Sequence, residues 1–428
     1  MRLQPLLAIW LTAPLLAACS SSAPVDPSLP AWSKLQIESL RKWVAAAPRD
    51  ALPLLDSGAL DRALDDGDEN SIRRAALDLS EKLANAHLHG CAGDAERAEW
   101  YMKDDGDSAN LRARLSEVLL HEGNLDSFFA GLKPAHPGYA ALRAAYVAET
   151  DPARRLTIAR NMERWRWMPQ SLGPDHVLVN VPAFEVYLWR QGAQAQTWRA
   201  VVGKTATPTP QLAATIKAVT FNPWWDVPPS IVQAGGSFSA RRGYIVTRGR
   251  HIRQKPGPGN ALGQMKVEMP NPYAIYLHDT PSKGLFGAAT RTFSHGCVRV
   301  GDALSLAATL LEGVRTRDDI DILLGIKKPK DEERRISKPP PAPAPSEPPP
   351  IKTTTVRLGA ELPVYIAYFT AAPRPDGTLG FMRDIYGRDA FITDPAKPGK
   401  ACEVGGGPAA PPVVRGPVKN GDQGDPGP

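Results

Sequence analysis

The stretch Ser294-His295-Gly296-Cys297-Val298-Arg299 gathers a thiol, an imidazole and a guanidinium within six residues. A second histidine, His278, lies 19 residues before Cys297. An imidazole beside a cysteine can take the thiol proton and leave the thiolate, which is the stronger nucleophile. The stretch therefore predicts a cysteine enzyme that transfers acyl groups.

Two histidines compete for the role of base. His295 is two residues from Cys297 and would share its face in an extended segment. His278 ends a predicted strand and could reach Cys297 from another direction. The residues alone leave both assignments open. They also leave open a buried thiol beside a structural histidine, and a zinc site built from His278, His295 and Cys297.

Neighbouring residues suit the same chemistry. Gly296 permits close backbone approach, as an oxyanion hole of successive backbone N–H groups requires. Tyr276 would share a strand face with His278, and Arg299 would share one with Cys297. A guanidinium at Arg299 could hold a substrate carboxylate through two hydrogen bonds.

Outward from this stretch, the chain divides into a helical part and a β-rich part. Residues 31–150 carry apolar side chains at helical spacing, with breaks at Pro48, Gly67, Gly90 and 134–138. The period changes to alternation from His176 onward, which is typical of strands. The sequence therefore predicts an α+β protein with a helical N-terminal region.

Within the second part, individual elements are predicted from periodicity and end signals. The predicted strands are 177–181, 184–188, 198–202, 216–221, 244–246, 273–277, 320–324, 362–370 and 381–386. The predicted helices are 155–170 and 302–311, the latter N-capped by Asp302 and C-capped by Gly313.

The N-terminus has the pattern of an export signal. Arg2 is followed by an apolar run, Leu6 to Leu16, that is too short to span a bilayer. Leu16-Ala17-Ala18-Cys19 matches a bacterial lipobox, so we expect cleavage to leave a lipidated Cys19. The absence of Asp after Cys19 resembles enteric lipoproteins of the outer membrane. We therefore expect a periplasmic protein, lipid-anchored in the outer membrane of a Gram-negative bacterium. An ordinary secretory signal is the alternative.

Charge and cysteines add little more. The net charge of +6 is spread without a dense Lys/Arg block, which indicates a solvated basic surface and no nucleic-acid partner. Export would permit a disulfide between Cys91 and Cys402, but the sequence leaves their pairing open.

The motifs resemble a known family. His278-Asp279-Thr280 and the stretch 294–299 resemble the active-site signature of YkuD-type L,D-transpeptidases, and the YcbB-like branch is the more similar. The other segments that carry this resemblance are 161–165, 201–204, 222–228, 256–263, Phe286 and 384–389.

The resemblance implies a domain organisation, with a helical scaffold followed by a YkuD-type catalytic domain. We expect the following parts: a signal peptide over 1–19, the scaffold over 20–150, the catalytic domain over 151–327, a proline-rich insertion or linker over 328–352, C-terminal strands of the catalytic domain over 353–391, and a disordered tail over 392–428. A lid over 233–270 and the absence of a separate peptidoglycan-binding domain are further expectations.

The resemblance also implies a reaction. Cys297 would attack the diaminopimelate carbonyl of a tetrapeptide stem, release D-Ala and form a thioester. A second stem's amine would then give a 3→3 cross-link. His278 would be the base, steered by the carbonyl of Asp279. His295, Gly296 and Cys297 would form the oxyanion hole.

Substrate contacts and partners follow from the same resemblance. The implied substrate-binding residues are Tyr276, Arg299, Ser294, Asp279 and Trp225. No metal or cofactor is implied, carbapenems would acylate the cysteine, and a penicillin-binding protein could act alongside. An L,D-carboxypeptidase or other hydrolase using the same cysteine, or a non-catalytic envelope-binding lipoprotein, are the alternatives.

Overall fold

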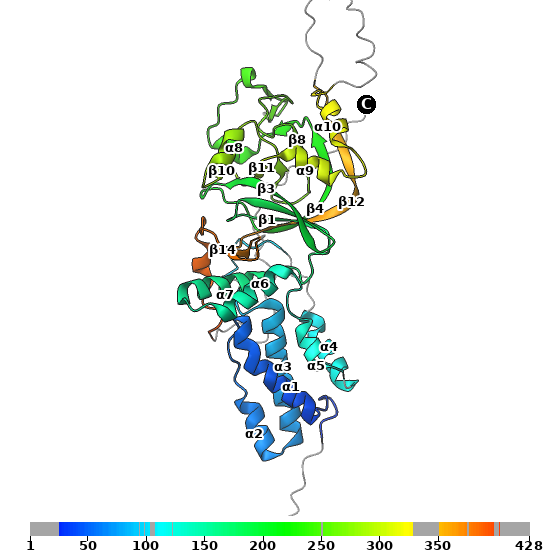
Figure 1. Cartoon of the computed structure of the whole chain (residues 1–428), viewed down its shortest axis with the longest axis vertical. Coiled ribbons are helices and arrows are strands. Elements are labelled where there is room, and N and C mark those ends of the chain that lie inside the picture. Colours follow the sequence, from blue (N-terminus) through cyan, green and yellow to red (C-terminus); the bar gives the residue numbers. More distant parts are fainter. Residues whose placement is uncertain are drawn as a thin grey trace, which may run out of the picture.

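The computed structural model describes residues 25–93, 95–97, 99–102, 108–121, 123–249, 251–327, 351–374, 376–397 and 402. The described chain is elongated, with helices at one end and a sheet-based domain at the other (Figure 1). The predicted signal peptide with Cys19, the proline-rich stretch 328–350 and most of the predicted disordered tail lie outside the described residues. The prediction of disorder is wrong for 392–397, where Ile392 is buried and Thr393 N donates to Glu96. None of the helices in the described part is both long and apolar enough to cross a membrane.

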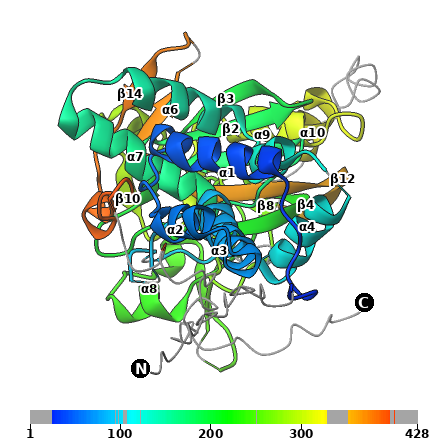
Figure 2. The same cartoon turned by 90° about the horizontal axis from the view of Figure 1, so that it is seen from below.

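The first half of the described chain is helical, as predicted. Its helices are α1 (Lys34–Ala46), the 3-10 helix Ala47–Asp50, α2 (Gly58–Asp66), α3 (Glu69–His89), α4 (Ser108–Leu120), α5 (Leu125–Ala130), α6 (Pro137–Ala148) and α7 (Pro152–Trp167). The Asp68 side chain caps α3 by accepting from Ser71 N, and Gly67 ends α2 in the left-handed conformation. Seen from below, α1 to α3 lie beneath the sheet-based domain (Figure 2).

Helix α7 joins the two halves through buried charges. Glu163 is fully buried, and its carboxylate accepts from Cys91 N at 2.6 Å, Ala92 N at 2.8 Å and Arg166 Nη1 at 2.8 Å. Arg164, also buried, pairs with Asp389 at 2.6 Å. Removing one partner of such a pair typically costs about 3–5 kcal/mol, because the other charge stays buried. The helix therefore fixes the loop after α3 and the C-terminal segment together.

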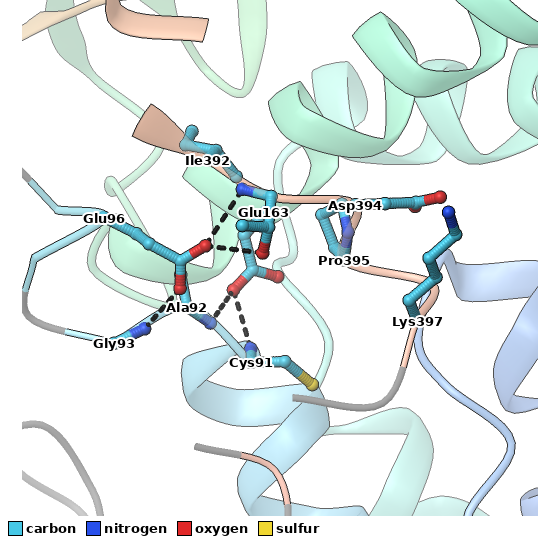
Figure 3. Close-up of a pocket in the computed structure, with 10 residues that line it drawn as sticks. Cys91, Ala92, Gly93, Glu96, Glu163, Ile392, Asp394, Pro395 and Lys397 are labelled. Carbon is cyan, nitrogen blue, oxygen red and sulfur yellow. Dashed lines mark hydrogen bonds between the residues drawn. The ribbon is translucent and has the colours of Figure 1, made fainter. Parts of the chain in front are cut away.

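A disulfide between Cys91 and Cys402 closes the same junction, with the two Cα atoms 4.9 Å apart. It settles the pairing that the sequence left open. Beside it, Glu96 accepts from Thr393 N at 2.9 Å and from Gly93 N at 2.9 Å (Figure 3). An open pocket of about 150 Å³ lies here, and the carboxylates of Glu96 and Glu163 in its lining already bind backbone N–H groups. The disulfide and these hydrogen bonds therefore stabilise the junction between the loop after α3 and the C-terminal segment.

The second half is built on one large sheet. Its strands are β1 (His176–Asn180), β2 (Glu185–Arg190), β3 (Ala193–Gly203), β4 (Leu212–Phe221), β8 (Met265–Glu268), β9 (Leu277–His278), β10 (Thr292–Ser294), β11 (Val298–Val300) and β12 (Thr354–Ala367). The strand order is β10-β3-β11-β9-β8-β4-β12-β1-β2, and β2 also pairs with β3. That extra pairing closes eight of the strands into a ring around an apolar core.

Smaller elements surround the sheet. They are β5 (Trp225–Asp226), α8 (Pro229–Gln233), β6 (Tyr244–Val246), β7 (Ile252–Gln254), α9 (Ala303–Leu310), α10 (Arg317–Leu323), β13 (Ala371–Pro373), β14 (Leu379–Phe381) and the 3-10 helices Ala240–Arg242, Lys283–Gly287 and Arg388–Phe391. Helix α9 begins at Asp302, whose side chain accepts from Ser305 N, as predicted. Its C-cap is Leu311 and not the predicted Gly313.

Two predicted strands are wrong in part or in full. Of 273–277, only Leu277 is in a strand, because the side chain of Asn271 accepts from Tyr273 N and Ile275 N and donates to Ile275 O. Such side-chain bonds compete with a ladder. The predicted strand 320–324 is mostly helix α10, which a capping box between Thr316 and Asp319 initiates.

The C-terminal prediction also needs correction. Strand β12 begins at Thr354, eight residues before the predicted start, and lies between β4 and β1. Of 381–386, only Phe381 is in a strand. The carboxylate of Asp384 instead accepts from the Tyr368 hydroxyl at 2.5 Å and from Arg388 N at 2.9 Å, which holds a loop.

Two helix-ending glycines allow a matched test of the α3–α7 junction. A Cβ on Gly90 (φ +77°) would lie 2.1 Å from Glu163 Oε1, whereas one on Gly67 (φ +67°) would meet nothing within 4 Å. We expect Gly67→Ala to cost about 1–2 kcal/mol of backbone strain. We expect Gly90→Ala to cost clearly more, because Glu163 must also move. Thermal unfolding monitored by circular dichroism measures this difference, and equal midpoints for the two variants would contradict the described junction.

Candidate active site

The site is built on the parallel pairing of β9 with β11. His278 lies opposite Arg299 in this register, and Val298 N donates to Tyr276 O at 2.9 Å. Leu277 and Val298 are fully buried in the core. Because side chains alternate along a strand, Tyr276, His278 and Arg299 with the adjoining Cys297 are directed to the opposite, polar face. The pairing brings these four predicted residues together.

His278 is buried, and its ring orientation is fixed. Nδ1 lies 2.5 Å from the carbonyl oxygen of Asp279. A carbonyl oxygen only accepts, so Nδ1 carries the proton and Nε2 is left as the basic atom. Burial and the charge of Arg299 lower the pKa of His278 to about 4, against the opposing effect of hydrogen bonds to the backbone of Asp279 and Leu262. His278 is therefore neutral at physiological pH.

The carboxylate of Asp279 is buried and binds other groups of the protein. It is 3% exposed, and its carboxylate accepts from Gln264 N at 2.8 Å and from Lys283. A Cβ on Gly263, whose φ is +64°, would lie 2.4 Å from the same carboxylate. Asp279 thus positions the His278 backbone and the loop at 263–264. This arrangement does not support the substrate contact expected from sequence.

The loop that carries Cys297 is shaped by Ser294. Its hydroxyl accepts from Gly296 N at 3.1 Å and donates to Cys297 O at 2.5 Å, and the residue is 2% exposed. Ser294 is therefore a loop-shaping residue and not an accessible substrate contact. Gly296 has φ +111°, a conformation that favours glycine.

The expected oxyanion hole changes accordingly. The N–H of Gly296 is already donated to Ser294. The N–H groups of His295 and Cys297 have no acceptor within the described part of the chain. These two groups are the donors available to an oxyanion.

A second shell of hydrogen bonds, which the sequence did not reveal, supports the loop from behind. Thr209 is fully buried and donates to Gly296 O at 2.8 Å, while accepting from Gly203 N at 2.9 Å. Tyr386 donates to Gly203 O at 2.6 Å and accepts from Thr209 N at 3.3 Å. The segment 384–389, noted in the sequence only as a motif, thus reaches the cysteine loop through Tyr386.

The thiol of Cys297 is held in its neutral form. Burial raises the pKa of Cys297 above its ordinary value, although the backbone of Tyr276 and the charges of Arg299 and Lys266 act in the opposite direction. Its Sγ lies 3.7 Å from Ala274 O. With His278 also neutral, the resting pair is thiol and imidazole, and not the thiolate expected from sequence.

Cationic groups flank the thiol. Arg299 Nε is buried and has no hydrogen-bond partner among the described residues. Lys266 lies opposite His278 on β8, with Nζ 4.6 Å from the Tyr276 ring centre and 3.1 Å from Glu268 Oε1. Lys266 and Glu268 were not predicted as site residues, although their alternation with the buried Met265 and Val267 is the sequence signal that places them on the polar face.

His295 does not join this cluster. It is exposed, and no contact joins its ring to Cys297 in the described structure. Burial, followed by the charges of Lys204 and Arg299, lowers the pKa of His295. The described residues hold no group of three or more His, Cys, Asp or Glu side chains placed to bind a metal. No hydrogen bond joins either histidine ring to Cys297 among the described residues, so His278 is favoured as the base by its place on the adjoining strand and by its fixed, buried ring.

A small sheet, β5-β7-β6, lies beside the site, and we call residues 225–259 the flap. Trp225 is half-buried in it, 6.3 Å from the Tyr244 ring. The side chain of Asn260 donates to Pro223 O and Lys255 O at 3.0 Å, which ties the flap ends together. Part of the lid expected over 233–270 is not a lid, because Met265–Glu268 is strand β8 of the main sheet.

Comparisons with known proteins agree with this two-part architecture. Residues 174–320 match the L,D-transpeptidase catalytic domain of the YkuD type, and residues 28–145 match a scaffold domain. A Haemophilus influenzae protein named "Putative L,D-transpeptidase" is 27% identical over 264 residues, which are 55% of this chain and 48% of that protein. The chain thus spans about half the length of this curated relative.

Solved structures show weaker likeness. An L,D-transpeptidase from Mycobacterium smegmatis has 14% identity and a TM-score of 0.25, over 45% of this chain and 58% of that one. L,D-transpeptidase 1 from Mycobacterium tuberculosis has 18% identity and a TM-score of 0.20, over 33% and 57%.

The fold and the site define a two-part protein, in which a helical scaffold carries a β-rich domain with a cysteine and a histidine on one polar face. Residues 174–320 are thus a YkuD-type L,D-transpeptidase catalytic domain, and residues 28–145 are a scaffold domain.

The neutral resting pair predicts the pH dependence of thiol alkylation. Because the pKa of Cys297 is raised, the thiolate fraction at pH 6–8 is small and grows about tenfold per pH unit. We expect the rate of iodoacetamide alkylation at Cys297 to rise in this way, without a plateau below pH 8. The other described cysteines, Cys91 and Cys402, are in a disulfide, and Cys297→Ala supplies the blank. A plateau beginning below pH 7 would show a thiolate–imidazolium pair instead.

Proposed function

We propose that this chain is a peptidoglycan L,D-transpeptidase of the YcbB-like branch, which forms 3→3 cross-links through a thioester on Cys297. The observation that carries the proposal is the single polar face on which Cys297, His278 and Arg299 meet. The substrates are stem peptides, with a meso-diaminopimelate tetrapeptide as donor and a second diaminopimelate amine as acceptor.

Acylation starts from the neutral pair. His278 Nε2 takes the thiol proton as Cys297 Sγ attacks the carbonyl carbon of the L-centre of diaminopimelate. The N–H groups of His295 and Cys297 stabilise the oxyanion. The C–N bond then breaks, His278 returns the proton to the leaving amine, and D-Ala departs. The thioester remains on Cys297.

The second half-reaction determines the product. The amine of another diaminopimelate attacks the thioester carbonyl carbon while His278 accepts its proton. The C–S bond then breaks, Cys297 Sγ takes the proton back from His278, and the new amide is the 3→3 cross-link. If water attacks instead, the product is a tripeptide, and the enzyme is an L,D-carboxypeptidase. Acceptor access decides between these outcomes.

Substrate carboxylates are bound by the flanking cations. Arg299 offers an unpartnered Nε at the polar face, and its fork geometry matches a carboxylate. Tyr276 and Trp225 supply aromatic surface on the two sides of the site. Lys266, paired with Glu268, adds a second positive charge.

The export pattern supports a location for this activity. A lipidated Cys19 would hold the enzyme at the periplasmic face of the outer membrane, next to the peptidoglycan. A penicillin-binding protein is a fitting partner, because such enzymes supply newly made strands.

Product analysis tests the proposal directly. The soluble form beginning at Ser20 is incubated with disaccharide-tetrapeptide, with Cys297→Ala alongside, and products are read by mass spectrometry. We expect a cross-linked dimer that has lost one D-Ala, made by the wild type alone. Tripeptide monomer alone would assign the hydrolase. No product, together with no carbapenem adduct on Cys297, would contradict both enzyme readings.

Arg299 can be tested against a matched arginine. We expect Arg299→Gln to lower kcat/KM by about 100-fold, because a charge-assisted bidentate contact is worth roughly 1.5–3 kcal/mol or more. Arg199→Gln is the control, since Arg199 is exposed on neighbouring β3. Equal kcat/KM values for the two variants with the same tetrapeptide would contradict a role of Arg299 in substrate binding.

A further inference from the structure

The flap lies in a stretch of unusual charge. Residues 227–267 contain no Asp or Glu, although they contain seven Lys and Arg. The acidic residue nearest before the stretch is Asp226, and the nearest after it is Glu268. The chain therefore concentrates positive charge in the segment beside the proposed catalytic face.

Most of this charge is not neutralised by the protein. Arg253 pairs with Asp226 at 2.5 Å. The remaining described cations of the flap are exposed and make no ion pair within the described residues; they are Arg241, Arg242, Arg248 and Lys255. By contrast, surface cations of the helical region such as Arg41, Lys82 and Arg112 pair with carboxylates. The flap is thus a cationic surface that an external anion can neutralise.

Buried amides hold this surface in shape. Gln254 is 2% exposed, and its Nε2 donates to Arg242 O at 3.0 Å and to Gly259 O at 2.8 Å. Lys255 N donates to Gly243 O at 2.9 Å. The backbone at Arg242 and Lys255 is therefore fixed, so binding there would not require these positions to become ordered first.

The flap adjoins the catalytic face. It is inserted between β4 and β8, and β8 pairs with the strand of His278. Just after the flap, Gln264 N donates to the Asp279 carboxylate at 2.8 Å. Aromatic rings line the same small sheet: Arg253 lies 4.9 Å from the Trp224 ring, and Arg242 lies 5.6 Å from the Tyr244 ring. A polymer with one segment at Cys297 would lay its neighbouring segments on this surface.

We propose that the cationic flap binds the carboxylates of peptidoglycan stem peptides that are not themselves reacting, and so holds the polymer at the site. This inference rests on the proposed function for the identity of the polymer. Stem peptides bear several free carboxylates, so repeated weak ion pairs would add up along the strand. Helix α6 ends at Ala148 and α7 begins at Pro152, so no separate binding domain lies between them to do this.

A lipid surface fits the flap less well. A peripheral membrane site combines cations with apolar side chains that insert between lipids. Among the flap's described residues, Val246, at 69% exposure, is the single large apolar side chain that is mostly exposed. The polar, aromatic and cationic composition favours a hydrated polyanion.

Co-sedimentation with purified diaminopimelate-type sacculi tests the inference without turnover, in a Cys297→Ala background. The test variant is Arg241→Glu with Arg242→Glu. The control is Lys34→Glu with Arg49→Glu, which makes the same charge change at exposed positions of the helical region. We expect the flap variant to bind about tenfold more weakly at 50 mM NaCl and the control to bind like its parent, with the difference shrinking at 300 mM NaCl as charges are screened.

The chemistry of the ligand is tested by modifying the sacculi. Chemical amidation of the stem carboxylates should abolish the flap-dependent part of binding. Equal binding by the flap variant and the control, or undiminished binding to amidated sacculi, would overturn the inference. Flap-dependent binding to phosphatidylglycerol vesicles but not to sacculi would overturn it in favour of a membrane surface.

Failure of this inference can be told from failure of the proposed function. In protein that retains Cys297, acylation by a carbapenem should proceed at the same rate with and without the flap substitutions, which shows that the site is intact. If binding to sacculi depends on the flap but no peptide product forms, the inference is supported and the proposed enzymatic function is contradicted. If soluble tetrapeptide is cross-linked but binding to sacculi does not depend on the flap, the proposed enzymatic function is supported and the inference is contradicted.

Discussion

The parallel pairing of β9 with β11 is the constraint on which the site depends. These strands contain two and three residues, yet their register places His278 opposite Arg299 and sets Tyr276 beside the cysteine loop. Segments this short have little stability alone. They hold because β8 and β3 flank them in a sheet that closes on itself, with Leu277 and Val298 anchored in the core. A slip of one residue would turn the catalytic side chains inward.

The rest of the chain supports that pairing from a distance. Tyr386 and Thr209 fix the cysteine loop from the C-terminal side. Arg164 on α7 forms an ion pair with Asp389 in the same C-terminal segment. The preceding residue, Glu163, accepts a hydrogen bond from the loop after α3. The helical region is thus coupled to the catalytic face through buried charges and not only through apolar packing. The flap is inserted between β4 and β8 and begins at Trp225, just after the end of β4.

The sequence predicted the larger features well. The change from helical to alternating periodicity near His176 located the two halves, because periodicity is a local pattern. The predictions that were wrong or missing concern features that depend on long-range contacts, or on side chains that compete with the backbone hydrogen bonds of a strand. Asn271 breaks the expected strand 273–277, and Thr209 reaches Gly296 across 87 residues. The thiol's state could not be predicted either, since it follows from burial that only the closed sheet creates. Ser294 and Asp279 were placed in the right site, but their side chains are directed into the protein.

The central claim is that Cys297 carries the acyl group. Intact-protein mass spectrometry, on wild-type enzyme acid-quenched within milliseconds to seconds of mixing with disaccharide-tetrapeptide, tests it most directly. We expect a transient adduct with the mass of the donor less D-Ala, mapped by peptide digestion to Cys297 and absent from Cys297→Ala. Product formation with no adduct, or an adduct on another residue, would contradict it.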